Sequence, residues 1–481
     1  MSQQKTRQQG TLIQAFGLPT AIILVVSSII GSGVYKKVAP MSAELQSPSL
    51  VLLVWLLAGL ISLLGVLTTA EIAGIVPGSG GPFAYFKRVY GRTFAFYYGW
   101  SSFTAIQSAS IASISYVFAH SLNAVIPLPR LSIDIEKTYH LFGVFYPLEN
   151  LGVKLAAVGL IVVLGFINFR GVKEGSTVSK IITSAVIASL FVITLLGLSM
   201  ATNGMTNIQT NASTYPPASF GAGNFGFITA IFTAMLGAFW AYEGWITLGF
   251  MAGEVKNPTR NIPLSLIFGT LIVITMYLLV NFAYLYVLPI DEMIAVSQDT
   301  NKIAAVEVIR KLFGDGGVFL ISLLIVVTTA GCTNTTIMAA ARIYYAMAEQ
   351  GIFFPKAAHI HHRFNTPGNA LFYQAIVSSI LVFSGSFDQL TDMLVFAQFI
   401  FYGAIAVGVF VMRRKEPDTP RPYKALGYPV VPALYILFCT YLVLNTVITR
   451  PRDAGIGLFL ILIGTPFYLY WNRKNRKPAD A

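Results

Sequence analysis

Apolar stretches long enough to cross a membrane alternate with short polar segments along almost the whole chain. A helix needs about 20 consecutive apolar residues to span a bilayer. This pattern predicts twelve spans, at 17–38, 48–75, 93–121, 152–170, 177–201, 224–252, 262–289, 316–347, 367–386, 390–412, 427–448 and 454–472. Only 11% of the 481 residues are charged, whereas a soluble protein carries about 25%. The expected fold class is therefore an all-α integral membrane protein with twelve transmembrane helices.

The basic residues gather in alternate polar segments. If the N-terminus is cytoplasmic, most of the 32 Lys and Arg residues fall on the cytoplasmic side, as the positive-inside rule requires. Lys36 and Lys37 are the main exceptions. We therefore expect a multi-pass protein of the cell membrane with both termini in the cytoplasm. On this interpretation the net charge of +12 sets the topology and does not indicate a nucleic-acid partner.

Two of the predicted spans are interrupted by glycine near their middle. Span one contains "SSIIGSGVYKK" at 27–37, and span six contains "LGAFWAYEGWITLG" at 236–249, with Gly237, Gly244 and the acid Glu243 at mid-depth. Glycine costs roughly 1 kcal/mol in a helix interior relative to alanine, and lipid offers the exposed backbone no water. Paired breaks at corresponding positions of two halves are the best sequence indication of a transporter binding site.

The spacing of the two breaks predicts how the halves are related. The second break comes five spans after the first, and because five is odd, a second five-helix unit would enter the membrane the other way up. We expect a five-plus-five inverted repeat with broken helices one and six. The predicted segments are a cytoplasmic N-terminal segment at 1–16, a first repeat at 17–201, an extracellular loop at 202–223, a second repeat at 224–412, a cytoplasmic loop with helices eleven and twelve at 413–472, and a cytoplasmic tail at 473–481.

The broken helices leave backbone groups free to bind a substrate. A break ends the hydrogen-bond ladder at mid-membrane and leaves N–H groups on one half and C=O groups on the other, with partial charges of about half a unit. An α-amino acid has a carboxylate and an ammonium that match these ends. We expect the amides after Ile30, at Gly31, Ser32 and Gly33, to bind the carboxylate, as helix N-termini bind anions. The carbonyls of Trp240, Ala241 and Glu243 would then bind the ammonium. The alternative is that both breaks are tolerated kinks.

Four side chains in the broken or polar spans have more than one possible role. Trp240 would serve as a gate over the substrate, or pack against a neighbouring helix. Glu243 would contact the ammonium, take up a proton as buried acids do more readily, or cap backbone amides. In span eight, Thr329 and Thr333 share a face. They would supply oxygens to a coupling cation, or bond to the backbone of a neighbouring helix.

Several classes of function are disfavoured by missing motifs. Cys332 and Cys439 are the only cysteines, and both lie in apolar runs, so we expect neither a disulfide framework nor a metal site. The sequence has no His-Glu-x-x-His motif and no G-x-x-x-x-G-K motif, which argues against an intramembrane enzyme and an ATP-driven pump. We expect no catalytic residue and no cofactor. A channel or a non-transporting amino acid sensor stays open as a remote alternative.

The same motifs resemble a known family. "IIGSGVYKKVAP" at 29–40, "AYEGW" at 241–245 and "MAGEVKNPTRNIPLSLIFGT" at 251–270 are similar to the amino acid–polyamine–organocation (APC) superfamily, in particular its L-amino acid transporter (LAT)-like branch. The stretches 53–91, 167–180 and 334–351 follow the same family pattern. The resemblance implies a twelve-helix carrier with the inverted repeat, the carboxylate on Gly31, Ser32 and Gly33, and the Trp240 ring as gate.

Three departures from the family pattern bear on mechanism. Many members carry a lysine in helix five that replaces a sodium ion, but here the position holds Val186, and Lys180 comes too early. Glu243 stands where Gly, Ser or Asp is usual. Residues 122–151 contain no cysteine, so no disulfide-linked heavy subunit is expected. We expect a neutral L-amino acid exchanger or permease that works by alternating access. The alternative is a proton- or sodium-coupled symporter, or a carrier of cationic amino acids.

Overall fold

The structure is a computed structural model that describes residues 16–76, 81–139, 146–171, 175–214, 226–364 and 366–476. Side chains are described there except those of residues 133, 137, 175–183, 250–254, 475 and 476. Nearly all of this described chain is helical, and its one extended pairing is an isolated bridge between Phe16 and Val255. The predicted all-α fold class is therefore confirmed.

Each of the first five predicted spans corresponds to helix. Span one is divided into α1 (Leu18–Ile29), α2 (Gly33–Lys36) and α3 (Val38–Leu45). Spans two to five are α4 (Pro48–Ile75), α6 (Arg92–Ser101) with α7 (Gln107–Val125), α9 (Leu151–Arg170) and α10 (Gly175–Met200). Short helices α5 (Pro82–Tyr90) and α8 (Ile133–Thr138) lie between them.

The remaining predicted spans are also helical. Span six consists of α12 (Gly226–Tyr242) and the 3₁₀ segment η2 (Trp245–Glu254). Spans seven to eleven correspond, in order, to α13 (Pro258–Val287), α15 (Ala304–Glu349), α16 (Gly368–Ser384), α17 (Phe387–Lys415) and α18 (Val430–Thr449). Span twelve consists of the pair α19 (Pro451–Leu462) and α20 (Gly464–Arg476). Short connecting helices are α11 (Gly204–Gln209), α14 (Ile290–Gln298) and η3 (Pro355–Ala358).

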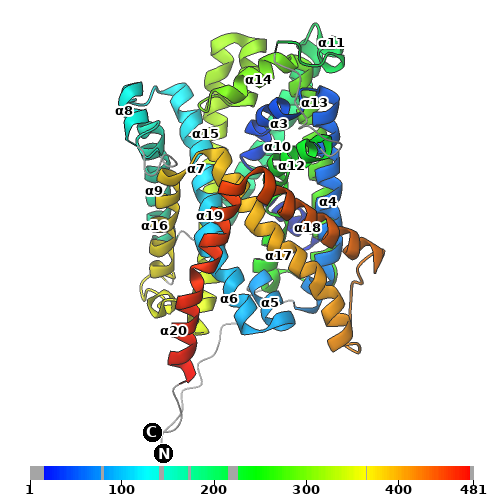
Figure 1. Ribbon diagram of the computed structural model, residues 1–481, viewed down its shortest axis with the longest axis vertical. Coiled ribbons are helices and arrows are strands. Elements are labelled where there is room, and N and C mark those ends of the chain that lie inside the picture. Colours follow the sequence, from blue (N-terminus) through cyan, green and yellow to red (C-terminus); the bar gives the residue numbers. More distant parts are fainter. Residues whose placement is uncertain are drawn as a thin grey trace, which may run out of the picture.

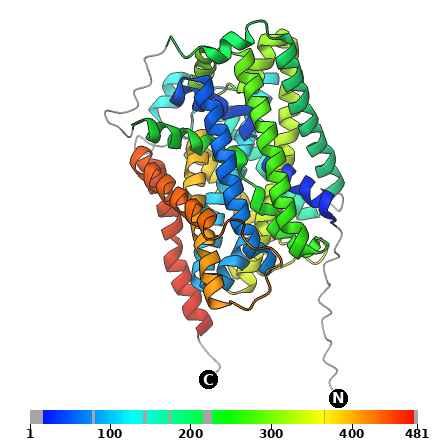
Figure 2. The same cartoon turned by 90° about the vertical axis from the view of Figure 1, so that its right-hand side faces the viewer.

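The helices form an elongated bundle. Most of them run along its long axis, with α8, α11 and α14 at one end and α5 and α20 towards the other (Figure 1). The turned view shows the same arrangement, with α19 and α20 along one flank (Figure 2). In the described residues, eight helices are long and apolar enough to cross a membrane, and three shorter apolar helices lie at Leu18–Ile29, Ser184–Met200 and Gly368–Ser384. These helices account for the multi-pass membrane character that the apolar pattern predicts.

Local signals explain where several helices begin. α4, α13 and α19 each have proline in the first turn, where a missing N–H costs nothing and the fixed φ suits a helix. α17 starts with a capping box, in which Ser386 and Gln389 exchange side-chain and backbone hydrogen bonds. The position of α17 matters because this helix contributes polar groups to both the centre and one end of the bundle.

Three elements differ from the predicted spans. α15 consists of two helices that meet at a kink at Gly314, whose φ of 63° only glycine adopts easily; the part after the kink corresponds to the predicted span, and the part from Ala304 to the kink is an additional helix. Span three contains a π-helical turn at Ser102–Ile106. The segment at 202–223 was expected to be a loop, but its described part, to residue 214, contains α11. The division into two inverted repeats stays a prediction.

Candidate substrate-binding site

Span one is broken where the sequence predicted it. α1 ends at Ile29, Ile30 has an extended backbone (φ −72°, ψ 99°), and the helix resumes at Gly33. The N–H groups of Ser32 and Gly33 donate no described hydrogen bond. They lie at the start of the second half of the helix, which is where amides free for an anion are expected.

Span six is broken one turn after Trp240. α12 ends at Tyr242, Glu243 and Gly244 form a turn, and η2 follows. Gly244 has φ 113°, and a Cβ there would lie 2.0 Å from the carbonyl oxygen of Ser28. Glycine is therefore required at this position both for its backbone conformation and for the close contact with α1.

The two breaks contact each other. A Cβ on Gly33 would lie 2.6 Å from Cα and 2.7 Å from Cβ of Ala241, so only glycine allows this approach. The Tyr277 hydroxyl of α13 lies 3.1 Å from the carbonyl oxygen of Ile29 and 3.0 Å from that of Ala241, and can donate to either. The Cys332 thiol of α15 lies 3.6 Å from the carbonyl oxygen of Ile30. The glycines thus bring together two segments that are more than 200 positions apart in the sequence.

Glu243 is held by two polar side chains of α17. Gln398 donates from Nε2 to the carboxylate at 2.5 Å, and the Tyr402 hydroxyl donates to it at 2.9 Å. These bonds orient the carboxylate towards α17. The sequence analysis did not predict that Gln398 and Tyr402 belong to the site. Their spacing of four positions places them on one face of an apolar span, and this pattern could have indicated a polar contact.

Trp240 is buried against Phe387, the first residue of α17. Its side chain is 6% exposed, and its ring meets that of Phe387 edge-on, with centroids 6.3 Å apart. The indole Nε1 has no hydrogen-bond partner in the described structure. Both a gate and a packing role are compatible with this position, so the gate stays a prediction.

Polar groups near the start of α17 and after α14 bind the two lysines that depart from the positive-inside rule. Lys37 is 1% exposed, and its Nζ lies 2.6 Å from Asp388 Oδ1 and 2.7 Å from Thr391 Oγ1. Lys36 donates to the carbonyl oxygen of Thr300, which follows α14, at 2.8 Å. Both charges are therefore neutralised or hydrogen-bonded locally. This cluster of Lys37 with the start of α17 was not predicted.

The threonines of span eight bond to their own helix. Thr329 donates to the carbonyl oxygen of Ile325 at 2.6 Å, and Thr333 donates to that of Thr329 at 2.8 Å. The expected bonds to a neighbouring helix are therefore absent for these two described hydroxyls, and a role in cation binding stays a prediction. In span five, Val186 is buried, whereas the Lys180 side chain lies outside the described residues.

A helix bundle whose two interrupted helices meet at their breaks, with backbone N–H groups there that have no described hydrogen-bond acceptor, has the architecture of a secondary transporter. Comparison with known proteins agrees: the chain belongs to the amino acid permease family, whose sequence profile matches residues 16–467. The family lies within the APC superfamily that the motifs resembled, and the LAT-like relatives below support the branch.

Three relatives are similar over nearly their whole length. The chain is 32% identical over 476 residues to the serine/threonine exchanger SteT of Bacillus subtilis, which covers 98% of this chain and 99% of that protein. It is 27% identical over 489 residues to the b(0,+)-type amino acid transporter 1 of Homo sapiens, with coverages of 99% and 93%. It is also 27% identical over 473 residues to the large neutral amino acids transporter small subunit 2 of Homo sapiens, with coverages of 98% and 83%.

Proposed function

We propose that this protein exchanges neutral L-amino acids across the cell membrane by alternating access. The amides of Gly31, Ser32 and Gly33 bind the α-carboxylate, and the carbonyls of Trp240, Ala241 and Glu243 bind the α-ammonium. The single observation that carries this proposal is the contact of the two breaks at Gly33 and Ala241. It puts the amides at the start of α2 next to the end of α12, where the carbonyl groups of the other break lie.

One of the carbonyl groups proposed to bind the ammonium already has a hydrogen-bond donor in the structure. The Ala241 carbonyl oxygen already has the Tyr277 hydroxyl within hydrogen-bond distance. A carbonyl oxygen has two lone pairs and can accept a second bond, so this contact positions the acceptor without blocking it. Glu243 remains charged and adds electrostatic attraction for the ammonium, while Gln398 and Tyr402 keep its carboxylate in place.

The names of the relatives support both the substrate class and the mode of transport. One is a serine/threonine exchanger and another a transporter of large neutral amino acids. We infer that this chain shares their preference for neutral side chains. We further infer transport without a disulfide-linked heavy subunit, since residues 122–151 contain no cysteine. Both termini are cytoplasmic in this proposal, and no residue is assigned a catalytic role.

A coupled symporter is the second candidate function. Two observations favour it: Val186 occupies the helix-five position where many family members carry a lysine, and an acid, Glu243, lies in the site. In that case a proton on Glu243, or a sodium ion near Thr329 and Thr333, would be transported together with the amino acid. Cationic amino acids would also become candidate substrates, because the acid would favour them.

Uptake of labelled amino acids into proteoliposomes tests these alternatives. Uptake is measured with and without internal substrate, sodium and a pH gradient. Exchange predicts that internal neutral amino acid accelerates uptake, with no requirement for sodium or for a proton gradient. Amines that lack a carboxylate should compete poorly. Sodium-dependent uptake would favour the symporter, whereas flux that internal substrate leaves unchanged would indicate a channel.

A further inference from the structure

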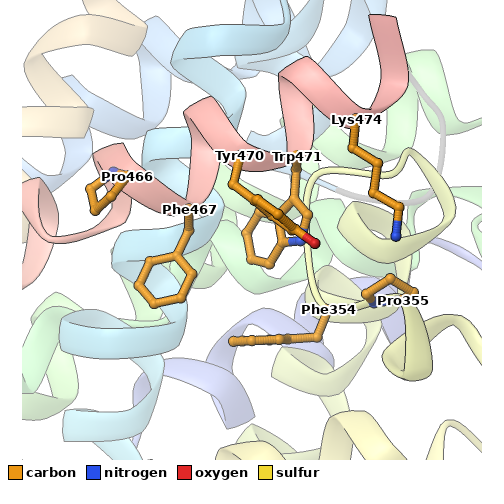
Figure 3. A pocket seen from close by; sticks show the side chains of 7 residues that line it. All are labelled: Phe354, Pro355, Pro466, Phe467, Tyr470, Trp471 and Lys474. Atoms are coloured by element: carbon orange, nitrogen blue, oxygen red, sulfur yellow. The ribbon is translucent and has the colours of Figure 1, made fainter. Parts of the chain in front are cut away.

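A groove lined mainly by aromatic side chains lies far from the substrate site, between α20 and the segment that follows α15 (Figure 3). α20 contributes Phe467, Tyr470, Trp471 and Lys474, and the facing segment contributes Phe354 and Pro355. The groove has a volume of about 470 Å³, which is within the range of small-ligand sites. The transport function proposed above uses none of these residues.

The aromatic side chains form a fixed, preformed surface. Phe467, Trp471 and Lys474 follow at helical spacing, so they lie along one stripe of α20. Trp471 is 5% exposed and forms the floor, with the Phe354 ring edge-on to it at 5.2 Å. The Phe467 ring stacks on Trp100 of α6 at 4.8 Å. Tyr470, in contrast, is 62% exposed and forms an open rim.

The surroundings of the groove differ between its two ends. Beyond the Phe467 end, α19 exposes Phe459 (61%) and Leu462 (60%), an apolar surface of the kind that contacts hydrocarbon. At the other end Lys474 is exposed, as is Lys356, which follows Pro355 of the lining. Neither of these two side chains forms an ion pair in the described structure. The groove therefore runs from an apolar surface to an end that carries uncompensated positive charge.

We propose that this groove binds one anionic phospholipid, with an acyl chain along the aromatic stripe and the phosphate group at Lys474. From Phe467 to Lys474 the helix rises by about 10 Å, which places the charged group beyond the apolar stripe, as in a lipid. Tyr and Trp side chains are typical of the membrane–water interface. Basic residues at the cytoplasmic side attract the anionic lipids of that leaflet. The charge of this end of the groove selects an anionic headgroup over a zwitterionic one.

Native mass spectrometry of the detergent-purified full chain tests the headgroup. Phosphatidylglycerol and phosphatidylcholine with identical acyl chains are titrated separately. We expect one phosphatidylglycerol molecule to be retained tightly, whereas phosphatidylcholine should bind more weakly and without reaching saturation. Lys474→Gln should weaken phosphatidylglycerol binding about fivefold and leave phosphatidylcholine unchanged. Arg473→Gln is the matched control, because Arg473 is exposed on the same turn but does not line the groove, and it should bind as the unmodified chain does.

A second pair of variants tests the apolar part. Tyr470→Ala should weaken binding of both lipids, whereas Leu469→Ala, whose side chain is 48% exposed outside the groove, should change neither. Equal binding of the two lipids, or equal losses in Lys474→Gln and Arg473→Gln, would overturn the proposal and leave only unspecific annular lipid. Glycerol phosphate that competes as well as the intact lipid would overturn the acyl-chain half. Both basic residues are exposed, so their variants should fold even if a groove variant does not.

Discussion

Gly33 is the residue on which the contact between the broken helices depends. A side chain there would overlap the backbone of Ala241, so we expect Gly33→Val to separate the two breaks and abolish transport. Membrane insertion should persist because the apolar run is unchanged, while the overlap should cost about 1–3 kcal/mol of stability. Transport in proteoliposomes and thermal unfolding in detergent measure the two effects.

Gly31→Ala is the matched control for this prediction. A Cβ at Gly31 would meet only the carbonyl oxygen of Ile29, at 3.9 Å. We therefore expect this variant to unfold at nearly the temperature of the unmodified protein. Normal uptake by folded Gly33→Val protein would show that the break in span one is only a kink.

Glu243 is the residue that separates substrate binding from ion coupling. Glu243→Gln keeps the shape and can still accept a hydrogen bond from Gln398, so the site should remain assembled. If the charge attracts the ammonium, KM should rise by about tenfold, or about 1.4 kcal/mol, at a similar maximal rate. Exchange kinetics at several pH values provide the measurement. A Gln variant that exchanges normally but loses a pH dependence would instead assign Glu243 to proton coupling.

An ion pair between buried Lys37 and partly exposed Asp388 joins the segment α2–α3 to the start of α17. Lys37 is buried, and removing one partner of such a pair leaves the other uncompensated, at a cost of up to about 3–5 kcal/mol. The Asp388 side chain is 46% exposed, so we expect the lower part of that range or less. Lys37→Met should therefore weaken the contact between α2–α3 and the start of α17, and amide hydrogen exchange should accelerate at 33–45 and 386–392.

The double variant Lys37→Met with Asp388→Asn is the control for this pair. It removes both charges, so it should recover part of the protection that the single variant loses. If Lys37→Met leaves hydrogen exchange unchanged in both segments, the pair does not hold this end closed.

The molecule as a whole has ion pairs at both ends of the bundle. Near α14, Lys37 meets Asp388 at 2.6 Å, and at the opposite end Glu71 of α4 meets Arg413 of α17 at 2.7 Å. Both pairs join α17 to an element of the first predicted repeat. Alternating access opens the two ends in turn, so under the proposed function these pairs are the contacts that must separate in successive half-cycles.

The orientation of the whole molecule in the membrane can be tested with introduced cysteines. Asp315, which is 95% exposed and directly follows the kink of α15 at Gly314, is expected outside, and the exposed Asp418, after α17, is expected in the cytoplasm. A membrane-impermeant maleimide should label Asp315→Cys in intact cells and Asp418→Cys only after permeabilisation. The unmodified chain, whose Cys439 is buried and Cys332 is partly buried, provides the background. The reverse pattern would invert the topology.

Linear features of the chain were enough to predict the spans and the positions of both breaks. A bilayer requires each crossing segment to be apolar and to satisfy its own backbone, so a span or a break is visible in a single stretch. Gly31, Gly33 and Gly244 stood out for this reason, and the predicted elements differ from the observed ones mainly at their ends and at the bend of α15.

Which side chains contact the two breaks and the lysines beside them depends only on how the helices pack. Lys37 pairs with Asp388, 351 positions away, and Tyr277 approaches the carbonyls of both breaks from α13. Which face of a helix meets which neighbour depends on the packing of the whole bundle, and in nearly uniformly apolar helices no periodic pattern marks that face. The same is true of the groove beside α20, where Phe354 meets Trp471 from a distant segment. Local chemistry determined where the backbone breaks, and long-range packing determined what surrounds each break.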